Sequence, residues 1–301
     1  MPSAPMISEN WPDLLAPGFK KIFMDTYEQH PSLLEKVFNV QDSEMASEKL
    51  SAVGAFPGIS EFTGKIEYSE SPEQGYDKTI SHTEYAGGYM VERKLAADDL
   101  YRIVSQFPES FAIAIKRFRE ELGWDKFNYA FSLAPSDGDA KALCVADHPS
   151  PADSSYAGDN LGTTSLSATA VSAARLAMRK FTDDRSGKIY VMGDTLIVPV
   201  DLEEKAWEIT NSKGQLDSAN NNPNFSSGRY DVIVAPFLSS AVDWFMVDKT
   251  MMKKNLFWFN REPVQYFKDK DSDTLIAKYA VYFRCSTAWQ DWRWIYGNNV
   301  G

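Results

Sequence analysis

The chain has few of the residues from which metal and redox sites are built. It contains only two cysteines, Cys144 and Cys285, and three histidines in 301 residues. The cysteines lie far apart and follow no motif spacing, so we expect buried thiols in a reducing compartment. The histidines, His30, His82 and His148, are accompanied by no HxH, HExxH or carboxylate spacing. The sequence therefore predicts no metal site.

The chain also lacks long apolar runs and an excess of positive charge. No run of about 18 apolar residues occurs, so no membrane-spanning helix is predicted. The N-terminal stretch MPSAPMISENWPDLL has no basic segment followed by an apolar one, which argues against a secretory signal. A net charge of −11 disfavours tight electrostatic binding of nucleic acid. The composition, 44% hydrophobic and 24% charged, is that of a folded protein with one large domain or two smaller ones.

Motifs for catalysis are missing as well. Gly-x-Ser-x-Gly does not occur, although a Ser–His–Asp triad assembled across the chain remains an alternative because spacing need not reveal it. The segment DDRSGK (183–188) resembles the end of a phosphate-binding loop, but Thr182 precedes it and the opening glycine is absent. An ordinary turn is the favoured interpretation. Paired carboxylates are one interpretation of Asp98-Asp99 and Asp183-Asp184, but helix caps and turns explain these pairs at least as well. No catalytic or cofactor-binding residue is predicted.

The most regular feature is an amphipathic helical pattern between Asp98 and Phe131. Apolar residues recur at steps of three and four and form one stripe, which a helix would bury: Leu100, Val104, Phe107, Phe111, Ile115, Phe118 and Leu122. Charged residues fall beside or behind this stripe: Lys116, Arg117, Arg119, Glu120 and Glu121. Pro108 cannot lie inside an unbroken helix. We therefore expect a short helix from Asp98 to Gln106 and a long one from Pro108 to Phe131, about 36 Å in length.

Residues 59–95 change to a period of two, which is typical of strands. The segments at 59–68 (ISEFTGKIEY) and 76–85 (YDKTISHTEY) alternate apolar or aromatic with polar residues. Pro72 and Gly75 between them predict a turn, and a third strand, YMVERKL, is expected after a Gly-Gly pair. The two long strands carry few large aliphatic side chains. A two-stranded ribbon of this kind is marginal alone and needs a neighbour, either its own chain or another copy.

The remaining segments mix helices and strands. Phe19 and Phe23 share one face of an N-terminal helix that ends before Pro31. A helix rich in small residues is expected to begin after a cap at Thr164 or Ser165, and another helix at Asp201. Strand patterns occur at 196–198, 230–238, 243–248, 256–259, 264–268 and 274–285.

Five tryptophans gather in the last part of the chain: Trp244, Trp258, Trp289, Trp292 and Trp294. An aromatic platform for sugars is one alternative. A subunit contact is a second, because tryptophan and arginine are favoured there. A core seam beneath the long helix is the favoured interpretation.

In this order, the elements resemble the Hong Kong 97-type fold of tailed-phage major capsid proteins, and more closely the Mu-like major head subunit group. The resemblance covers nearly the whole chain and is carried by these stretches: GAFPGISEF, HTEYAGGYMVERKLAADDLY, ALCVADHP, LIVPVDLEEKAWEI, DWFMVD and DWRWIYG. It implies an α+β fold with five parts: an N-terminal arm (1–58), an extended hairpin loop (59–95), a peripheral domain with the long spine helix (96–164), an α/β axial domain (165–260) and returning strands of the peripheral domain (261–301).

The resemblance also implies a function. It is that of a structural protein without enzymatic activity or cofactor, which self-assembles as pentamers and hexamers into an icosahedral shell. The shell would enclose the double-stranded DNA of a tailed bacteriophage without tight sequence-specific binding, and the acidic charge suits containment. Portal, scaffold and decoration proteins are further expected partners. Assembly is expected in the host cytoplasm, without a membrane, and the product is the virion capsid.

Particular assembly residues follow only from the resemblance. The tip of the extended loop is expected to contact a neighbouring subunit through Tyr68, Ser69, Pro72, Gly75 and Tyr76. The polar stretch 211–229 is a candidate for the loop of the axial domain. The chain begins directly with an arm, so no fused scaffold segment is expected. Neither Lys65 nor Lys78 lies in a motif that identifies a crosslinking lysine.

Three alternatives remain open from the sequence. An encapsulin-type compartment would share the fold but house cargo enzymes. A soluble hydrolase or a sugar-binding module would instead be a monomer or small oligomer.

Overall fold

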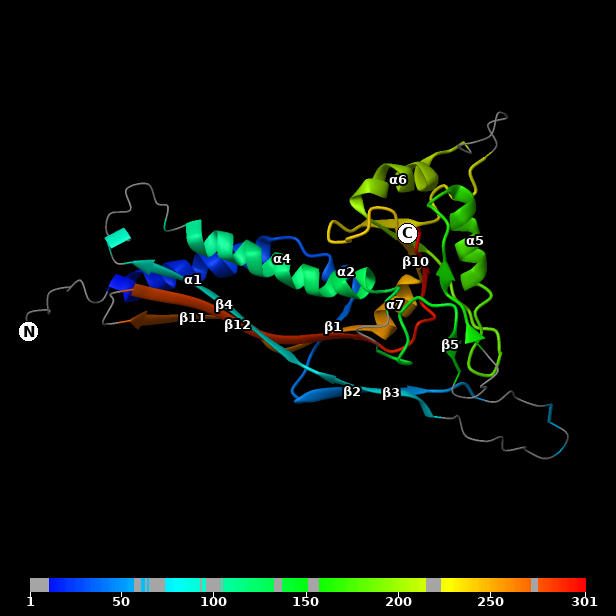
Figure 1. The fold of residues 1–301 in the computed structure, drawn as a ribbon, viewed down its shortest axis with the longest axis horizontal. Helices are drawn as coiled ribbons and strands as arrows, with labels where there is room; N and C mark the ends of the chain where they lie inside the picture. Colours follow the sequence, from blue (N-terminus) through cyan, green and yellow to red (C-terminus); the bar gives the residue numbers. More distant parts are fainter. Residues whose placement is uncertain are drawn as a thin grey trace, which may run out of the picture.

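The computed structural model describes residues 11–56, 61–62, 64, 74–92, 94–95, 104, 106–132, 137–150, 157–214, 223–271 and 276–301. These residues form a mixed α+β structure around two sheets (Figure 1). The sheets lie at different ends of the molecule, and the long helix α4 (Gln106–Asn128) lies along the four-stranded sheet and ends near the other half (Figure 1). The expected short helix from Asp98 to Gln106 lies almost entirely outside the described residues.

The first sheet has four strands in the order β1 (Asn39–Asp42), β11 (Leu256–Asp271), β12 (Ile276–Trp289) and β4 (Thr83–Glu92). The β11–β12 and β12–β4 pairs are antiparallel, whereas β1 joins β11 in parallel. The two separate strands expected at 256–259 and 264–268 form one strand, β11. Register shifts on either side of Glu262 bend it without ending it.

Two helices cover one face of this sheet: α1 (Trp11–Gln29) and α4 (Gln106–Asn128) (Figure 1). Alternate residues of β12 are buried on that face: Ala277, Tyr279, Val281, Phe283 and Cys285. The long helix expected from the sequence is confirmed, and Pro108 lies in its first turn, where a missing N–H costs nothing. A short helix, α2 (Leu34–Val37), packs against its C-terminal half.

The buried side of α4 differs from the expected stripe. Phe118 is 37% exposed, whereas Glu120, expected on the solvent side, is only 4% exposed. The reason is that α4 is covered from more than one direction. Its first half faces the sheet and α1, and its second half faces α2 and the other sheet, so the buried surface turns around the helix. Trp124 and Phe127 are buried there together with Ile115, which belongs to the expected stripe.

The second sheet has five strands in the order β7 (Leu161–Gly162), β13 (Ile295–Asn298), β10 (Trp244–Val247), β8 (Thr195–Val198) and β9 (Asp231–Val234). Every residue of β8 and β10 is buried. Two helices pack on these strands, α5 (Ala168–Met178) on β13 and β10 and α6 (Glu203–Asn211) on β8 and β9. A helix α7 (Lys249–Asn255), capped by Asp248, leads from β10 into β11.

The cap of α5 is not the one expected from the sequence. Ser167 caps this helix, and its hydroxyl accepts a hydrogen bond from the Ala170 amide at 3.1 Å. Thr164 and Ser165 lie before the helix. The Thr164 carbonyl instead accepts a hydrogen bond from the Trp244 indole at 2.9 Å, which fixes the approach to α5.

A two-stranded ribbon lies beside both sheets, below them in Figure 1. It pairs β2 (Ser47–Val53) with β3 (Gln74–Ser81) in antiparallel fashion. The expected partner, 59–68, lies mostly outside the described residues. Gly75 was expected in a turn but lies in β3, where a Cβ would stand 2.7 Å from the Ala52 Cβ. The pairing therefore requires glycine at this position.

The strand after the ribbon also differs from the prediction. The Gly87-Gly88 pair does not begin a new strand, because β4 runs through it as part of the four-stranded sheet. A Cβ on Gly88 would lie 2.6 Å from the Tyr279 carbonyl oxygen, so glycine permits this close approach. The ribbon thus ends near Ser81 rather than at Leu95.

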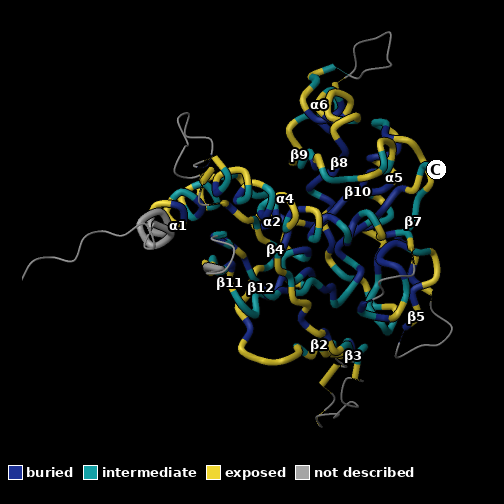
Figure 2. Tube along the Cα trace, turned by 60° about the vertical axis from the view of Figure 1, so that its left-hand side comes forward, coloured by how far each residue is buried: buried dark blue, intermediate teal, exposed yellow. Residues whose placement is uncertain are grey.

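The larger of two hydrophobic clusters among the described residues extends through both sheets. The tryptophans expected to form a core seam are buried in it. The ring centroids of Trp294 and of Phe127 on α4 are 6.2 Å apart, so the C-terminal segment packs against the long helix as expected. Figure 2 shows the buried residues concentrated where the two sheets meet α4. The expected division at residues 260 and 261 falls inside β11, and β13 returns to the five-stranded sheet.

Candidate functional site

The ribbon is held against the body of its own chain by two hydrogen bonds. The Tyr76 hydroxyl donates to the Pro149 carbonyl at 2.7 Å. On the other strand, the Gln290 amide donates to the Ser51 carbonyl at 2.9 Å. Burial raises the pKa of Tyr76 to about 12, with a smaller contribution from Asp139, so the phenol keeps the proton that it donates. These contacts fix the direction in which the ribbon leaves the body.

A carboxylate on the ribbon joins its two strands. Asp77 forms an ion pair with Lys49 at 2.7 Å and accepts a hydrogen bond from the Gln74 side chain at 2.6 Å and another from the Ser51 hydroxyl. These hydrogen bonds, that from Lys49 first, hold the pKa of Asp77 at about 2. The carboxylate is therefore charged at neutral pH and ties β2 to β3.

His82 lies at the hinge where the ribbon becomes β4. Its Nε2 is 3.1 Å from the Ser43 hydroxyl, and its Nδ1 is 3.0 Å from the Ser286 hydroxyl of β12. Burial lowers the pKa of His82, Glu48 acts in the opposite direction, and Arg284 adds to the lowering. A neutral imidazole therefore links the start of the ribbon to the four-stranded sheet.

The predicted tip residues are only partly brought together. Tyr68, Ser69 and Pro72 lie outside the described residues. Gly75 and Tyr76 lie in β3, and Tyr76 points toward the body, where Pro149 binds it. The residues of the body that hold the ribbon, Pro149 and Gln290, were not predicted. Gln290 and its partner Ser51, for example, are 239 positions apart and share no motif.

Strand β2 of the ribbon and the segments directly before and after this strand expose large apolar side chains. The exposed fractions are 64% for Met45, 72% for Val53, 76% for Phe56 and 70% for Phe62. Single exposed apolar residues are normal, but four along one protruding segment are typical of a binding surface. This exposed apolar set is the clearest candidate contact on the ribbon.

His148 is the histidine with the strongest polar environment. It is fully buried, its Nδ1 is 2.6 Å from Asp139 and its Nε2 is 3.1 Å from the Asn160 side-chain oxygen. Asn160 is oriented by a 2.8 Å hydrogen bond from its own amide nitrogen to the Leu143 carbonyl. The imidazole also stacks on Trp292, with ring centroids 4.4 Å apart. Since both ring nitrogens are engaged and water does not reach them, His148 fixes this loop rather than serving as a general base.

The segment at 183–188 is an ordinary turn, as favoured from the sequence. The Asp183 carboxylate accepts hydrogen bonds from the Arg185 amide at 2.9 Å and the Gly187 amide at 2.7 Å. A protein carboxylate therefore occupies the amides that a phosphate would need. In the part of the chain that the structure describes, no cluster of three or more histidine, cysteine, aspartate or glutamate side chains is arranged to hold a metal ion. Nor is any helix there long and apolar enough to cross a membrane.

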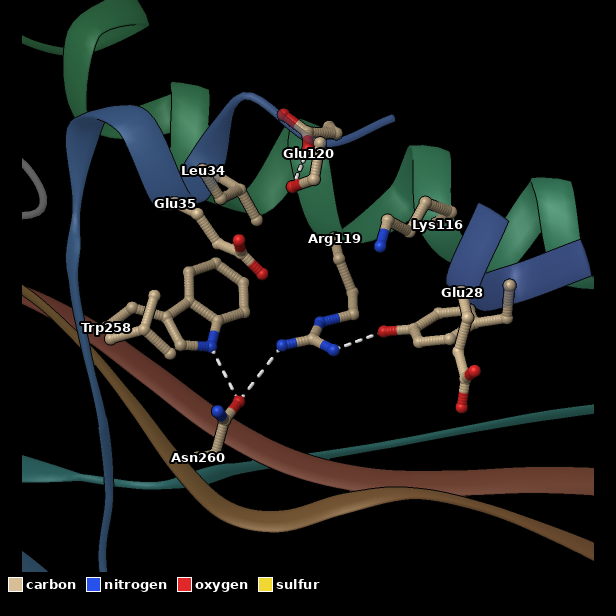
Figure 3. A pocket seen from close by; sticks show the side chains of 11 residues that line it. Glu28, Leu34, Glu35, Lys116, Arg119, Glu120, Trp258 and Asn260 are labelled. Carbon is tan, nitrogen blue, oxygen red and sulfur yellow. Dashed lines mark hydrogen bonds between the residues drawn. The ribbon is translucent and has the colours of Figure 1, made fainter. Parts of the chain in front are cut away.

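A cavity of about 320 Å³ lies between α1, α2, α4 and the start of β11 (Figure 3). Arg119 crosses it, donating to Asn260 at 3.0 Å and to the Tyr27 hydroxyl. Its guanidinium lies 5.1 Å from the centre of the Trp258 ring, a favourable cation–π position. Figure 3 shows these side chains joining α4 to α1 and the sheet, so the cavity belongs to the contact that holds the N-terminal segment in place.

Glu120 is the second polar anchor of that contact. Its carboxylate accepts hydrogen bonds from the Ser32 hydroxyl at 2.5 Å, the Leu33 amide at 3.0 Å and the Trp124 indole at 3.2 Å. A buried carboxylate is tolerated only where donors of this kind compensate its lost hydration. The helix periodicity did not reveal Glu120, since α2 covers it from a distant part of the sequence.

Both cysteines are free and buried, as expected. Burial raises the pKa of Cys285 to about 11 and also raises that of Cys144. Such thiols are poor nucleophiles near neutral pH. Together with the buried tryptophans and the engaged His148, they point to a structural role for the residues that the hydrolase and sugar-binding alternatives would have used.

Comparison with known proteins identifies the family. The sequence matches the family model described as phage capsid protein over residues 75–298. The match covers most of the chain, so this protein belongs to the phage capsid protein family. It is a structural component of a virion capsid.

A curated relative agrees with this assignment. The chain is similar to the major head subunit of the Mu-like prophage FluMu of Haemophilus influenzae, with 28% identity over 141 residues. That stretch is 46% of this chain and 44% of the relative, so the match spans less than half of the relative's length. The resemblance to the Mu-like head subunit group expected from the sequence is confirmed.

Solved structures share the fold at low identity. The chain is similar to the capsid of bacteriophage JBD30, with a TM-score of 0.56 and 17% identity over 78% of this chain and 100% of that one. It is similar to the mature capsid of bacteriophage PhiM1, with a TM-score of 0.57 and 8% identity over 90% of this chain and 87% of that one. It is also similar to a virus-like particle from Pyrococcus furiosus, with a TM-score of 0.56 and 8% identity over 94% of this chain and 98% of that one. The α+β fold of Hong Kong 97-type capsid structures is thereby confirmed for the chain as a whole.

Proposed function

We propose that this chain is the major capsid protein of a tailed bacteriophage and that it self-assembles, as pentamers and hexamers, into an icosahedral shell around double-stranded DNA. The observation that carries the proposal is the ribbon with its exposed apolar set, Met45, Val53, Phe56 and Phe62. A second copy of the chain would remove this surface from water. Family membership and the capsid structures of the same fold support the same assignment.

The parts of the fold would then take different places in the shell. The four-stranded sheet with α1 and α4 would be the peripheral domain, and the five-stranded sheet with α5 and α6 the axial domain. The stretch 211–229, which follows α6, would be the loop at the axis of pentamers and hexamers. The extended loop would comprise the ribbon β2–β3 and the residues between its strands, 47–81, rather than 59–95.

The extended loop would reach over a neighbouring subunit. Tyr76 is already bound to Pro149 of its own chain. The neighbouring subunit would therefore be contacted by the residues that precede Tyr76 in the loop. The proposed tip residues there are Tyr68, Ser69 and Pro72, with Gly75 holding the strands close enough to project them. Weak contacts suit this role, since a closed shell repeats each of them many times.

The charge of the chain fits containment of DNA. With a net charge of −11, an inner surface would hold packaged DNA without the many phosphate contacts that resist packaging and release. Portal, scaffold and decoration proteins would be further partners, and assembly would take place in the host cytoplasm.

Electron microscopy of the purified protein tests the proposal. Closed shells of uniform diameter are expected, whereas a soluble hydrolase or a sugar-binding module would remain a monomer or small oligomer at the same protein concentration. A matched pair of variants links assembly to the ribbon. Phe56→Ser, in the exposed apolar set, should reduce shell yield, whereas Tyr190→Ser, 80% exposed on the five-stranded side, should not. A chain that stays monomeric in every condition, with or without other virion proteins, would contradict the function.

An encapsulin-type compartment is the second candidate, favoured by the fold likeness to the virus-like particle of Pyrococcus furiosus. The contents of shells isolated from their natural host decide between the two. DNA inside supports the phage capsid, and a packaged enzyme without DNA supports the compartment.

A further inference from the structure

Two oppositely charged surfaces lie on the five-stranded half of the protein. The first, called the basic face here, surrounds the C-terminal end of α5 and consists of Arg175, Arg179, Lys180 and Arg229 together with Leu176 and Phe225. Leu176 and Phe225 are each 55% exposed. The guanidinium carbon atoms of Arg229 and Arg175 lie 4.0 Å and 5.2 Å from the centre of the Phe225 ring. The positive charges are thus grouped around an exposed apolar centre.

The second surface, called the acidic face here, lies on α6 and the turn before it. It consists of Asp201, Glu203, Glu204 and Glu208 together with Val200 and Trp207. Trp207 is 62% exposed and Val200 is 53% exposed. Lys205 is the one basic residue on the same turns, so this surface is strongly negative at neutral pH.

The charges of the two faces are not neutralised within the chain. Among the described residues, no basic side chain lies within 4 Å of the carboxylates of the acidic face, and no carboxylate lies that close to the four cations of the basic face. Elsewhere the protein pairs charges readily, for example Arg293 with Asp184 at 2.7 Å. Grouped like charges repel one another, and an opposite surface relieves that repulsion.

The positions of the faces fit a contact between copies. In Figure 1, α6 lies at the upper edge of this half and α5 at its right-hand edge. The two helices pack on different strands of the sheet, α5 on β13 and β10 and α6 on β8 and β9. Two different but complementary surfaces on one chain define a heterologous contact, in which one face of each copy meets the other face of the next. Such a contact closes into a ring when its rotation permits.

We propose that the acidic face of one copy docks on the basic face of the next copy around the ring axis of a capsomer, with Trp207 as its apolar anchor. The proposal rests on the proposed self-assembly and names the surfaces that carry one of its contacts. Tryptophan and arginine at the centre of such a contact supply most of the binding free energy. The surrounding charges set the orientation and exclude a contact between two like faces.

Charge reversal tests the pairing. One variant reverses the basic face (Arg179→Glu, Lys180→Glu and Arg229→Glu), so that only Arg175 of its four cations remains against three carboxylates. A second reverses the acidic face (Asp201→Lys, Glu203→Lys and Glu204→Lys), so that only Glu208 of its four carboxylates remains against three cations. A third variant combines all six changes. All these side chains are exposed, so the variants should melt at the parent temperature. Each single-face variant should give at least about tenfold fewer rings and shells, because like charges then meet at every contact. The combined variant should recover shell yield to within about threefold, since each contact again joins opposite charges.

A matched control and a mixing experiment sharpen the result. Asp25→Lys and Glu28→Lys on α1 with Glu109→Lys on α4 change the net charge by the same amount as the acidic-face variant, away from both faces, and this control should assemble like the parent. Mixing the two single-face variants should restore rings with an even number of subunits, in which the two alternate, but not pentamers. Closed shells should therefore be missing from the mixture, while hexamers appear.

Three outcomes would overturn the contact. They are single-face variants that assemble like the parent, a combined variant as defective as either single one, and a control as defective as the acidic-face variant. A parent that never assembles would instead overturn the proposed function, and this contact with it. Native mass spectrometry of the rings and electron microscopy of the shells distinguish these cases.

Discussion

The Tyr76 hydroxyl donates a hydrogen bond to the carbonyl of Pro149, 2.7 Å away, so the ribbon of this capsid protein is latched to its own body before any neighbour is present. Pro149 lies in the short strand β5 (His148–Pro149), which pairs with β6 (Ala157–Gly158). The neighbouring His148 is held by Asp139 at 2.6 Å. The latch therefore joins a protruding element to a rigid part of the core.

Removing the latch should loosen the ribbon without unfolding the protein. Tyr76→Phe deletes one hydrogen bond, which is worth about 0.5–1.5 kcal/mol. Amide exchange in β3 of the free subunit should therefore become several-fold faster, while the melting temperature stays nearly constant. Tyr190→Phe is the matched control, because its hydroxyl contacts only the exposed Met192 sulfur. Unchanged exchange in Tyr76→Phe would mean that other contacts hold the ribbon.

The buried Glu120 should be far more sensitive than its exposed neighbour. Glu120→Gln can keep an acceptor for the Ser32 hydroxyl and the Leu33 amide, which share one carboxylate oxygen, but then puts an amide donor where the Trp124 indole needs an acceptor. The change should lower the free energy of unfolding by about 1–3 kcal/mol. Glu121→Gln on the next position breaks only an exposed pair with Arg117 and should cost at most about 1 kcal/mol. Chemical denaturation of the free subunit measures both. Equal losses would contradict the role assigned to Glu120.

Substituting two phenylalanines of α4 by alanine should lower the free energy of unfolding by different amounts in the same experiment. Phe127 is 1% exposed, and Phe127→Ala should cost about 3–5 kcal/mol. Phe118 is 37% exposed and contacts Tyr85 and the buried Phe283. The sequence pattern predicted a comparable cost at Phe118, but partial burial reduces the expected loss in Phe118→Ala to about 1–2 kcal/mol. A larger loss at Phe118 than at Phe127 would refute this ordering.

The His82 hinge should make the stability of the subunit depend on pH. Burial lowers the pKa of His82 in the folded protein, while the unfolded chain keeps a value of about 6.5. Above pH 6.5 the imidazole of His82 is neutral in both the folded and the unfolded state, so its contribution to the free energy of unfolding is at its maximum. As the pH falls below 6.5, the unfolded chain takes up a proton that the folded hinge resists, so stability decreases.

Thermal melting of the free subunit between pH 7.5 and pH 5 measures this dependence. His82→Gln should reduce the slope of melting temperature against pH. His30→Gln, on the residue after α1, should keep the parent's slope. If the slope of His82→Gln equals that of the parent, the hinge does not control it.

Assembly should protect the ribbon. In free subunits, amides of β2 and β3 should exchange quickly, because Tyr76, Gln290 and few apolar contacts hold them. In shells, where a neighbour would cover the exposed apolar set, the same amides should exchange at least about tenfold more slowly. Amides of the buried strand β10 serve as the internal reference. Equal protection in both states would mean that the ribbon never crosses to another subunit.

The sequence by itself determined the elements whose signal is local. The three- and four-residue steps around Ile115 and the position of Pro108 defined the long helix, because hydrophobic periodicity and the missing proline N–H act within a few residues. The missing motifs around His148 and the tryptophan-rich C-terminus likewise predicted structural rather than catalytic roles. The ordered set of short stretches was enough to indicate the capsid family.

Only the tertiary structure decided which segments meet. A period of two shows that β3 has two faces but does not identify its partner strand. The pairing with β2 and the close approach of Gly75 to Ala52 followed from long-range contacts. Glu120 became buried and Phe118 exposed because α2 and the second sheet cover α4 from different sides. The basic and acidic faces arose in the same way, since Arg175 on α5 and Arg229, just before β9, meet at the Phe225 ring only when α5 packs on the sheet that contains β9.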